Sequence, residues 1–205
     1  MAHLLLYLTG TIPYLREVVV NAQIIELPLA PAQPVTIGQL IGRYRVESII
    51  GEGGMGVVFS ARHLDLDMRV AIKVIRAELA RDERIVERMM NEARAVASLK
   101  SDHVVRVYDV ARLPNGTPYM VLELVDGPDL DRVLEASGPM SVDDAVAHML
   151  DVCVGLSDAH SRGIIHRDIK PENLLVESLT DGTTRVKISD FGIAKKAITS
   201  RREMS

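Results

Sequence analysis

The sequence predicts an α+β fold, in which a β-rich first part is followed by a mainly helical second part. Short apolar runs typical of strands occur at 44–50, 57–59, 70–73, 104–110 and 118–124. Apolar residues recur with helical spacing within 81–100 and again within 141–163. Two further apolar runs, 174–176 and 185–188, surround Asp181-Gly182 and predict a closing hairpin.

Composition indicates an ordinary soluble globular protein, with 47% hydrophobic and 25% charged residues. A length of 205 residues fits one large domain or two small lobes. The net charge of −4 provides no basic surface, so we expect no nucleic-acid partner. The single cysteine, Cys153, excludes an intramolecular disulfide and suits a reducing compartment. Its helical context predicts a buried thiol.

The N-terminal segment carries the least information. We expect residues 1–42 to be a leader or linker that could be partly disordered, because three prolines, Pro28, Pro31 and Pro34, interrupt regular structure. The apolar start at 1–8 lacks a basic region and a cleavage site, so no signal peptide is expected. No apolar run reaches the roughly 18–20 residues of a transmembrane segment. These features together predict a cytoplasmic protein.

A glycine-rich loop, Gly51-Glu-Gly-Gly-Met-Gly56, separates the first two predicted strands. Glycine lacks a Cβ, so the backbone N–H groups of such a loop can approach a phosphate closely. The pattern alone also fits a Rossmann turn or a flexible hairpin. A Rossmann loop opens a helix, whereas residues 57–61 are β-branched and aromatic, which favours a strand–loop–strand hairpin.

Lys73 closes the apolar run 70–73, and a helix is predicted at 81–100. The apolar stripe of this helix consists of Ile85, Met89, Val96 and Leu99. Glu92 falls on the same stripe and is expected to face the core. A buried carboxylate needs a partner, for which Lys73 is the natural candidate. The alternative is a solvated helix face that carries Glu92.

Turn and cap signals organise the rest of the chain. Asn115-Gly116 predicts a hairpin between 104–110 and 118–124, and a short helix is expected at 129–136. Ser141 is expected to cap a helix that ends near Gly163. The predicted buried face of this helix consists of Ala145, Met149, Val152, Leu156 and Ala159.

The segment 164–176, IIHRDIKPENLLV, carries the densest chemistry. Asp168 can accept a proton from an attacking hydroxyl, and Lys170 can neutralise a phosphoryl group. The side-chain carbonyl of Asn173 can bind a hard cation such as Mg²⁺. A second acidic motif, Asp190-Phe-Gly192, follows Asp168 by 22 residues (190 − 168). Together these residue types indicate phosphate chemistry.

These motifs resemble those of eukaryotic-like Ser/Thr protein kinases, and the glycine loop looks most like the bacterial members. The resemblance covers about 43–197 and implies a bilobal kinase-like fold. It implies a complete β-rich N-lobe with helix C at 43–124, and a partial helical C-lobe at 125–205 that ends in the activation segment. The implied activity is transfer of the ATP γ-phosphate to Ser/Thr hydroxyls of protein substrates, with ATP and Mg²⁺.

The resemblance assigns roles to individual residues. The implied catalytic residues are Asp168, Lys170, Lys73 and Glu92, and the implied metal ligands are Asn173 and Asp190. The residues implied to bind ATP are Ile50, Gly51, Glu52, Gly53, Gly54, Met55, Gly56, Val57, Val58, Ala71, Lys73, Glu123, Val125 and Leu175. Leu122 takes the gatekeeper position before the hinge 123–125. An implied stacked spine consists of Val96, Val107, His166 and Phe191.

The chain ends at Ser205, 13 residues after Gly192 (205 − 192), so the resemblance implies a domain truncated within the activation segment. The apolar faces near 149–156 and 174–176 are then expected to lose partners and to be exposed. The alternative function is a catalytically impaired ATP-binding or interaction module.

Overall fold

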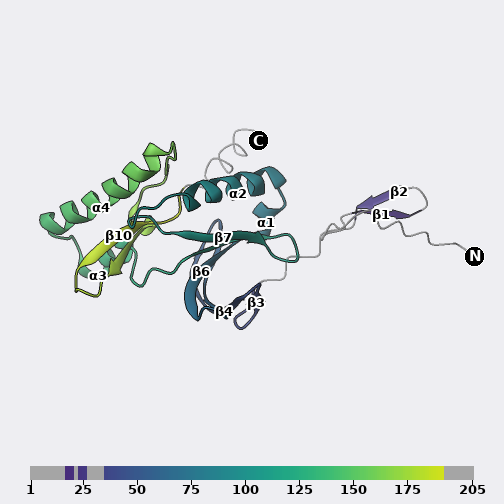
Figure 1. The fold of residues 1–205 in the computed structure, drawn as a ribbon, viewed down its shortest axis with the longest axis horizontal. Helices are drawn as coiled ribbons and strands as arrows, with labels where there is room; N and C mark the ends of the chain where they lie inside the picture. The colour runs from purple at the N-terminus through teal and green to yellow at the C-terminus, as the bar shows by residue number, and fades with distance from the viewer. Residues whose placement is uncertain (1–16, 21–22, 27–34, 192–205) are drawn as a thin grey trace, which may run out of the picture.

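The computed structural model describes residues 35–191 and, for their backbone only, 17–20 and 23–26; the side chains of Arg88 and Glu92 are not described. The predicted α+β fold is confirmed. A curled antiparallel sheet forms the first lobe, and a group of helices with a small hairpin forms the second (Figure 1).

The sheet of the first lobe has the strand order β3-β4-β5-β6-β8-β7, with antiparallel neighbours throughout. Its strands are β3 (Leu40–Ile41), β4 (Tyr44–Gly53), β5 (Gly56–His63), β6 (Met68–Ile75), β7 (Val107–Arg112) and β8 (Pro118–Glu123). Gly116, with φ of 84°, forms the predicted turn between β7 and β8. The core of the sheet includes Phe59, Ile72 and Val121, all nearly inaccessible to solvent.

Part of the expected leader is structured. β1 (Glu17–Val20) and β2 (Gln23–Glu26) pair as a separate antiparallel ribbon. β3 pairs with β4, and Val35 packs against the sheet core, so the sheet of the first lobe begins before residue 43.

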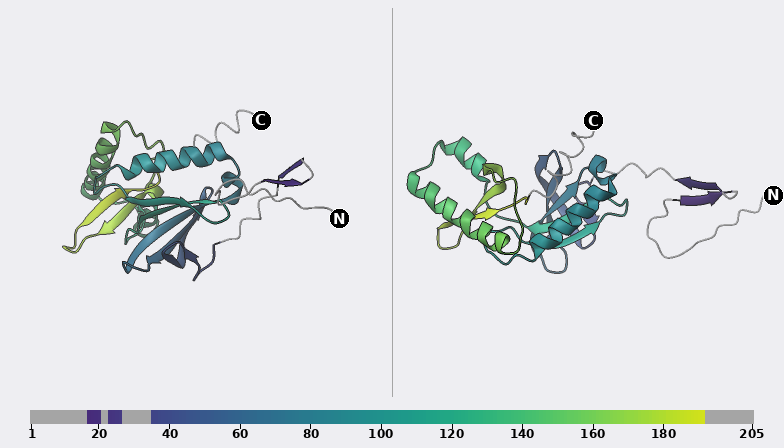
Figure 2. Two further views of the ribbon diagram at one scale, coloured as in Figure 1. Left: turned by 45° about the vertical axis from the view of Figure 1, so that its right-hand side comes forward. Right: turned by 90° about the horizontal axis from the view of Figure 1, so that it is seen from above.

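Two helices follow β6. The sequence indicated a single helix at 81–100, whereas the structure has a short α1 (Ala77–Ala80) before α2 (Glu83–Ala97). Asp82 caps α2 by accepting a hydrogen bond from the Arg84 N–H at 3.1 Å. α2 lies across the sheet beside β7, as Figure 2 shows from two further sides. Its buried face includes Ile85, Met89 and Val96, as predicted.

The second lobe consists of α3 (Leu130–Ser137), α4 (Val142–Ser161), the 3₁₀ turn η1 (Pro171–Asn173), β9 (Leu174–Ser178) and β10 (Thr184–Ile188). β9 and β10 form the predicted antiparallel hairpin. Ser141 caps α4 as expected: its hydroxyl accepts from the Asp144 N–H at 3.1 Å and donates to the Asp144 carboxylate at 2.6 Å. None of the helices in the described part of the chain is both long and apolar enough to span a membrane.

The buried face of α4 agrees with the prediction at Val152 and Ala159, and Leu156 packs against the same core, but Met149 does not belong to it. Val152, Gly155 and Ala159 are buried, whereas Met149 is 44% exposed and Cys153, predicted to be buried, is exposed. Gly155 fits against the segment before β7, because a Cβ there would lie 2.8 Å from the His103 carbonyl oxygen. The helix therefore turns this small residue towards its neighbours. We call the exposed side the outer face of α4; it consists of Val142, Val146, Met149, Leu150, Cys153 and Val154.

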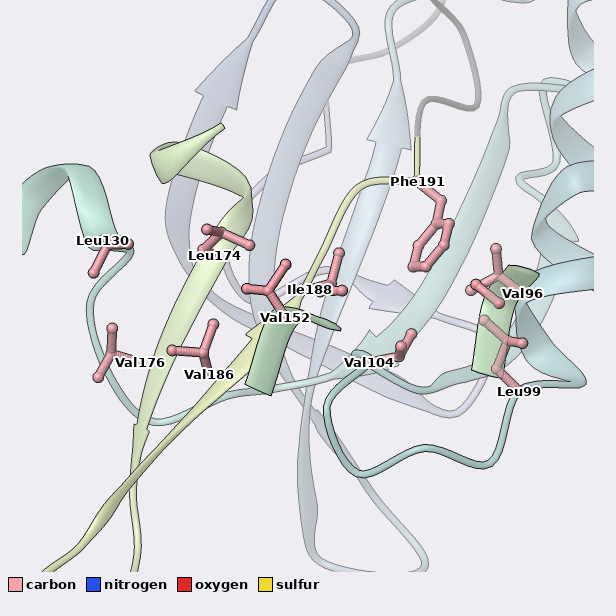
Figure 3. Close-up of a cluster of buried hydrophobic side chains, with 11 residues drawn as sticks. Val96, Leu99, Val104, Leu130, Val152, Leu174, Val176, Val186, Ile188 and Phe191 are labelled. Atoms are coloured by element: carbon pink, nitrogen blue, oxygen red, sulfur yellow. The ribbon is translucent and has the colours of Figure 1, made fainter. Parts of the chain in front are cut away.

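An interlobe cluster of apolar side chains joins the two lobes (Figure 3). It contains Val96, Leu99, Val104, Leu130, Val152, Ala159, Leu174, Val176, Val186, Ile188 and Phe191. The expectation that the strands near 174–176 would be exposed was wrong: Leu174 and Val176 are buried, because α3, α4 and β10 cover them.

Backbone contacts reinforce the junction between the lobes. The Val105 N–H donates to the Ile188 carbonyl at 2.9 Å, and the Ile188 N–H donates to the His103 carbonyl at 2.9 Å. On the other side, the Val176 N–H donates to the Pro128 carbonyl at 2.8 Å. The segment before β7 and the connection after β8 are therefore both attached to the β9–β10 hairpin.

Candidate active site

One face of the sheet carries several of the predicted ATP-binding residues. The strand register pairs Val58 with Lys73, and Ala71 with Leu122. Ala71 and Lys73 are two residues apart on β6, so their side chains project from the same face. Leu122 also lines a small cavity of about 30 Å³ together with Phe191 and other residues, which suits the gatekeeper position implied for it.

Lys73 is buried, and its Nζ forms an ion pair of 2.5 Å with the Asp190 carboxylate. This pair connects the sheet to the segment that follows β10. The sequence predicted Glu92 as the partner of Lys73; the Glu92 side chain lies outside the described residues, so that pairing stays a prediction. Asp190 has a φ of 51°, a left-handed conformation that is unusual for a residue other than glycine.

His166 organises the loop that carries Asp168, and it is only 1% exposed. Its Nδ1 accepts a hydrogen bond from the Asp168 N–H at 3.2 Å, so Nε2 carries the proton and donates to the Ser189 carbonyl at 2.8 Å. Burial lowers the pKa of His166, although the hydrogen bond to Ser189 opposes this effect. A neutral His166 therefore holds Asp168 close to the segment that contains Asp190.

The implied spine is present as a set of contacts. The ring of His166 lies 4.6 Å from that of Phe191, measured between centroids. Val96 and Phe191 belong to the interlobe cluster, and Val107 packs against that cluster. His166 thus makes the packing contact that the resemblance implies for the spine.

Asn173 holds the loop from the other side. Its Nδ2 donates to the Asp168 backbone carbonyl at 2.8 Å and to the Asp168 carboxylate at 3.3 Å. The backbone carbonyl of Asn173 accepts from the Ser189 N–H at 2.8 Å. Since Ser189 precedes Asp190, these bonds bring the three residues Asp168, Asn173 and Asp190 into one neighbourhood.

The donor set of this neighbourhood suits a divalent cation. With its amide nitrogen directed at Asp168, Asn173 presents Oδ1 as its ligand atom, and Asp190 presents a carboxylate. Both are hard oxygen donors of the kind that Mg²⁺ prefers. The two implied metal ligands are therefore chemically fitted to the ion, while their role stays a prediction.

Lys170 lies beside these carboxylates. Its Nζ is 3.1 Å from the Glu172 carboxylate. This hydrogen bond raises the pKa of Lys170, and the charges of Asp168 and Asp190 act in the same direction. Lys170 therefore remains cationic beside these acidic groups.

The glycines of the loop between β4 and β5 have different surroundings. A Cβ on Gly56 would overlap the Val74 carbonyl oxygen of the neighbouring strand, so this glycine lets β5 pair with β6. A Cβ on Gly53 or Gly54 would have no atom within 4 Å. These two glycines leave open space at the tip, where a close approach to phosphate is possible.

Arg76 was not found by sequence reasoning. Its Nε donates to the Gly53 carbonyl at 2.9 Å, and its guanidinium lies 3.3 Å from the Glu52 carboxylate. It follows β6 directly and ties the loop tip to that strand. The only signal in the sequence was a basic residue three positions after Lys73.

The remaining predicted adenine contacts occur at the junction of the lobes. Glu123 ends β8, and its N–H donates to the Arg106 carbonyl at 2.9 Å. Val125 is buried in the connection that follows. Leu175, expected on the opposite side of adenine, lies on β9 at a backbone bridge to Asp129.

Comparison with known proteins gives a consistent result. The family model described as protein kinase domain matches residues 44–205. Serine/threonine-protein kinase pkn3 of Myxococcus xanthus is 44% identical over 160 residues, which cover 78% of this chain and 29% of that protein. Serine/threonine-protein kinase PknB of Mycobacterium tuberculosis is 42% identical over 163 residues, covering 78% of this chain and 25% of that protein.

A crystal structure of the Mycobacterium tuberculosis PknI kinase domain has the same fold, with a TM-score of 0.70 and 29% identity. The match covers 79% of this chain and 64% of that one. The chain thus spans less than a third of the length of the two curated relatives and about two thirds of the solved domain.

Proposed function

This chain belongs to the protein kinase family, and we propose that it transfers the γ-phosphate of ATP to serine and threonine hydroxyls of proteins. The observation that carries the proposal is the ion pair between Lys73 and Asp190 beside the Asp168–Asn173 hydrogen bonds. It joins a cation from the sheet to acidic groups from the second lobe. Phosphoryl transfer depends mainly on positioning and on charge neutralisation, which such an arrangement provides.

Each residue has a proposed task. Gly53 and Gly54 admit the phosphates under the loop, and Lys73 binds the α- and β-phosphates, oriented by Glu92. Asp168 accepts or orients the attacking hydroxyl, with its position supported by His166 and Asn173. Lys170 neutralises the transferred phosphoryl group.

We also propose that Asn173 and Asp190 hold Mg²⁺, which when bound would neutralise phosphate charge. The adenine is proposed to lie between Val58 and Ala71 on one side and Leu175 on the other, against the backbone of Glu123 and Val125. The partners are protein substrates with Ser or Thr. A cytoplasmic location is proposed because ATP is the co-substrate and the only thiol is free.

The test is Asp168→Asn, compared with Asp143→Asn at an exposed position of α4. Loss of a general base typically costs 10²–10⁴-fold, so we expect phosphate transfer to a generic Ser/Thr substrate to fall at least about 100-fold. Binding of Mg-ADP, measured by calorimetry, should stay within about twofold of the original chain. Unchanged transfer in Asp168→Asn would refute the catalytic assignment, and transfer lost equally in Asp143→Asn would show a general defect.

A further inference from the structure

A buried lysine outside the predicted site forms close charge contacts at the lobe junction. Lys187 lies on β10 and is only 2% exposed. Its Nζ is 2.5 Å from one carboxylate oxygen of Glu123 and 3.7 Å from one of Glu177. A charge removed from water in this way loses its hydration, and these two carboxylates are the ion partners that compensate for the loss.

The contacts of Lys187 belong to a larger closed arrangement, which we call the charge ring. Its members are Lys187, Glu123, Arg106, Asp102, Arg185 and Glu177. Three are cations and three are carboxylates, so the charges balance. Arg106 pairs with Asp102 at 2.6 Å, and Arg185 pairs with Glu177 at 2.8 Å.

The other two connections are an ion contact of 3.9 Å between Arg185 and Asp102 and a backbone hydrogen bond. In the latter, the Arg106 N–H donates to the second Glu123 carboxylate oxygen at 3.2 Å. The Lys187 end is buried, whereas Asp102 and Arg106 are more than half exposed. The rigid part of the ring is therefore the pair formed by Lys187 and Glu123.

This pair spans the two ends of the proposed nucleotide site. Glu123 ends β8, and its backbone is the proposed contact of the adenine edge. Lys187 precedes Asp190, a proposed metal ligand, by three residues on the same segment. The buried ion pair and a step of three residues along the chain thus connect the proposed adenine-binding backbone with Asp190, the proposed metal ligand.

We propose that Lys187 is a positioning residue that fixes the separation between the adenine-binding edge and Asp190. The inference rests on the proposed function, because it presupposes a nucleotide at this junction. A ligand that contacts only the adenine edge should be insensitive to the ion pair. A ligand that must reach both ends, such as Mg-ADP, should bind less tightly when the two ends are no longer held in register.

The test compares these two kinds of ligand on the Lys187→Met variant of the full chain. We expect the Kd of Mg-ADP, measured by calorimetry, to rise about tenfold and that of adenosine to change less than twofold. Val186→Ala provides the matched control, because it removes buried methyl groups from the same strand while keeping the charge ring. Both ligands should bind this control as they bind the original chain.

Each outcome decides the question. If Lys187→Met weakens the binding of both ligands equally, or does not weaken the binding of Mg-ADP, the positioning role is overturned. Tighter binding of Mg-ADP would also overturn it, because the ion pair would then hold the two ends in a geometry that hinders binding. If the original chain binds neither ligand, the proposed function itself fails. If Lys187→Met does not fold, Glu177→Gln removes one carboxylate partner and should weaken Mg-ADP about threefold while leaving adenosine binding unchanged.

Discussion

Lys73 and Asp168 reach the same site by different routes. Lys73 projects from the middle of a sheet, where pairing of β6 with β5 and β8 fixes its position. Asp168 lies in a loop, where its N–H donates to the buried His166 side chain and its backbone carbonyl accepts from the buried Asn173 side chain. The first lobe therefore depends on strand packing, whereas the second depends on a few polar side chains, one of which is a histidine whose pKa is lowered by burial.

The largest effect on stability is expected at Phe191, which packs where the two lobes meet. This side chain is 5% exposed, belongs to the interlobe cluster and packs against the His166 ring, with the two ring planes tilted by 56°. Phe191→Ala should lower the free energy of unfolding by about 3 kcal/mol, the lower end for a buried Phe→Ala change. Urea unfolding measures the loss, and Val142→Ala on the outer face of α4 should change it by less than about 0.5 kcal/mol. Equal losses in both variants would contradict a junction held by the cluster.

A smaller loss is expected from the strand packing that positions Lys73. Gly56→Ala would force β5 away from the Val74 carbonyl, so we expect it to cost about 2 kcal/mol of unfolding free energy, as overpacking does. Gly53→Ala, in open space in the same loop, should change it by less than about 1 kcal/mol. Thermal or urea unfolding of the two variants separates these cases. If Gly56→Ala and Gly53→Ala lower the free energy of unfolding by the same amount, close packing against Val74 is not what distinguishes the two glycines.

The smallest effect is a pH dependence of stability that arises from His166 in the second lobe. Burial lowers the pKa of His166 below the value of about 6.5 expected in the unfolded chain. As the pH falls through 6.5, the unfolded chain takes up a proton before the folded chain does. The contribution of His166 to stability is therefore present above pH 6.5 and is lost as the pH falls to its folded-state pKa.

His166 alone can change the free energy of unfolding by at most about 1.4 kcal/mol per pH unit. Urea unfolding between pH 7.5 and 5 should show a steeper loss for the original chain than for His166→Gln. Identical slopes in the two proteins would mean that His166 binds protons equally in both states.

Local patterns predicted most elements of the fold because their causes are local. The Ser141 cap and the turn at Asn115-Gly116 depend on residues within three or four positions. Periodicity also predicted the buried stripe of α2; for α4 it predicted Val152 and Ala159 correctly but not Met149. The close approach of Gly155 to His103, 52 residues away in sequence (155 − 103), is a contact that periodicity does not encode.

The site was predicted from motifs, and its supporting contacts were not. The charge ring joins Lys187 to Glu123 across 64 positions, a pairing that no local pattern encodes. A signal was present, since Lys187 lies between Val186 and Ile188 in a short apolar strand, where a cation needs a partner. The pairing of Lys73 with Asp190 likewise depends on how the lobes meet.

The outer face of α4 has a practical consequence. Cys153 lies in the middle of that face and is the only thiol among the 205 residues. A maleimide dye would therefore attach to the chain at one known place without any substitution. Because its neighbours Met149, Leu150 and Val154 are apolar and exposed, the emission of an environment-sensitive dye would change whenever something covers this helix. The protein thus carries a built-in attachment point for an optical reporter.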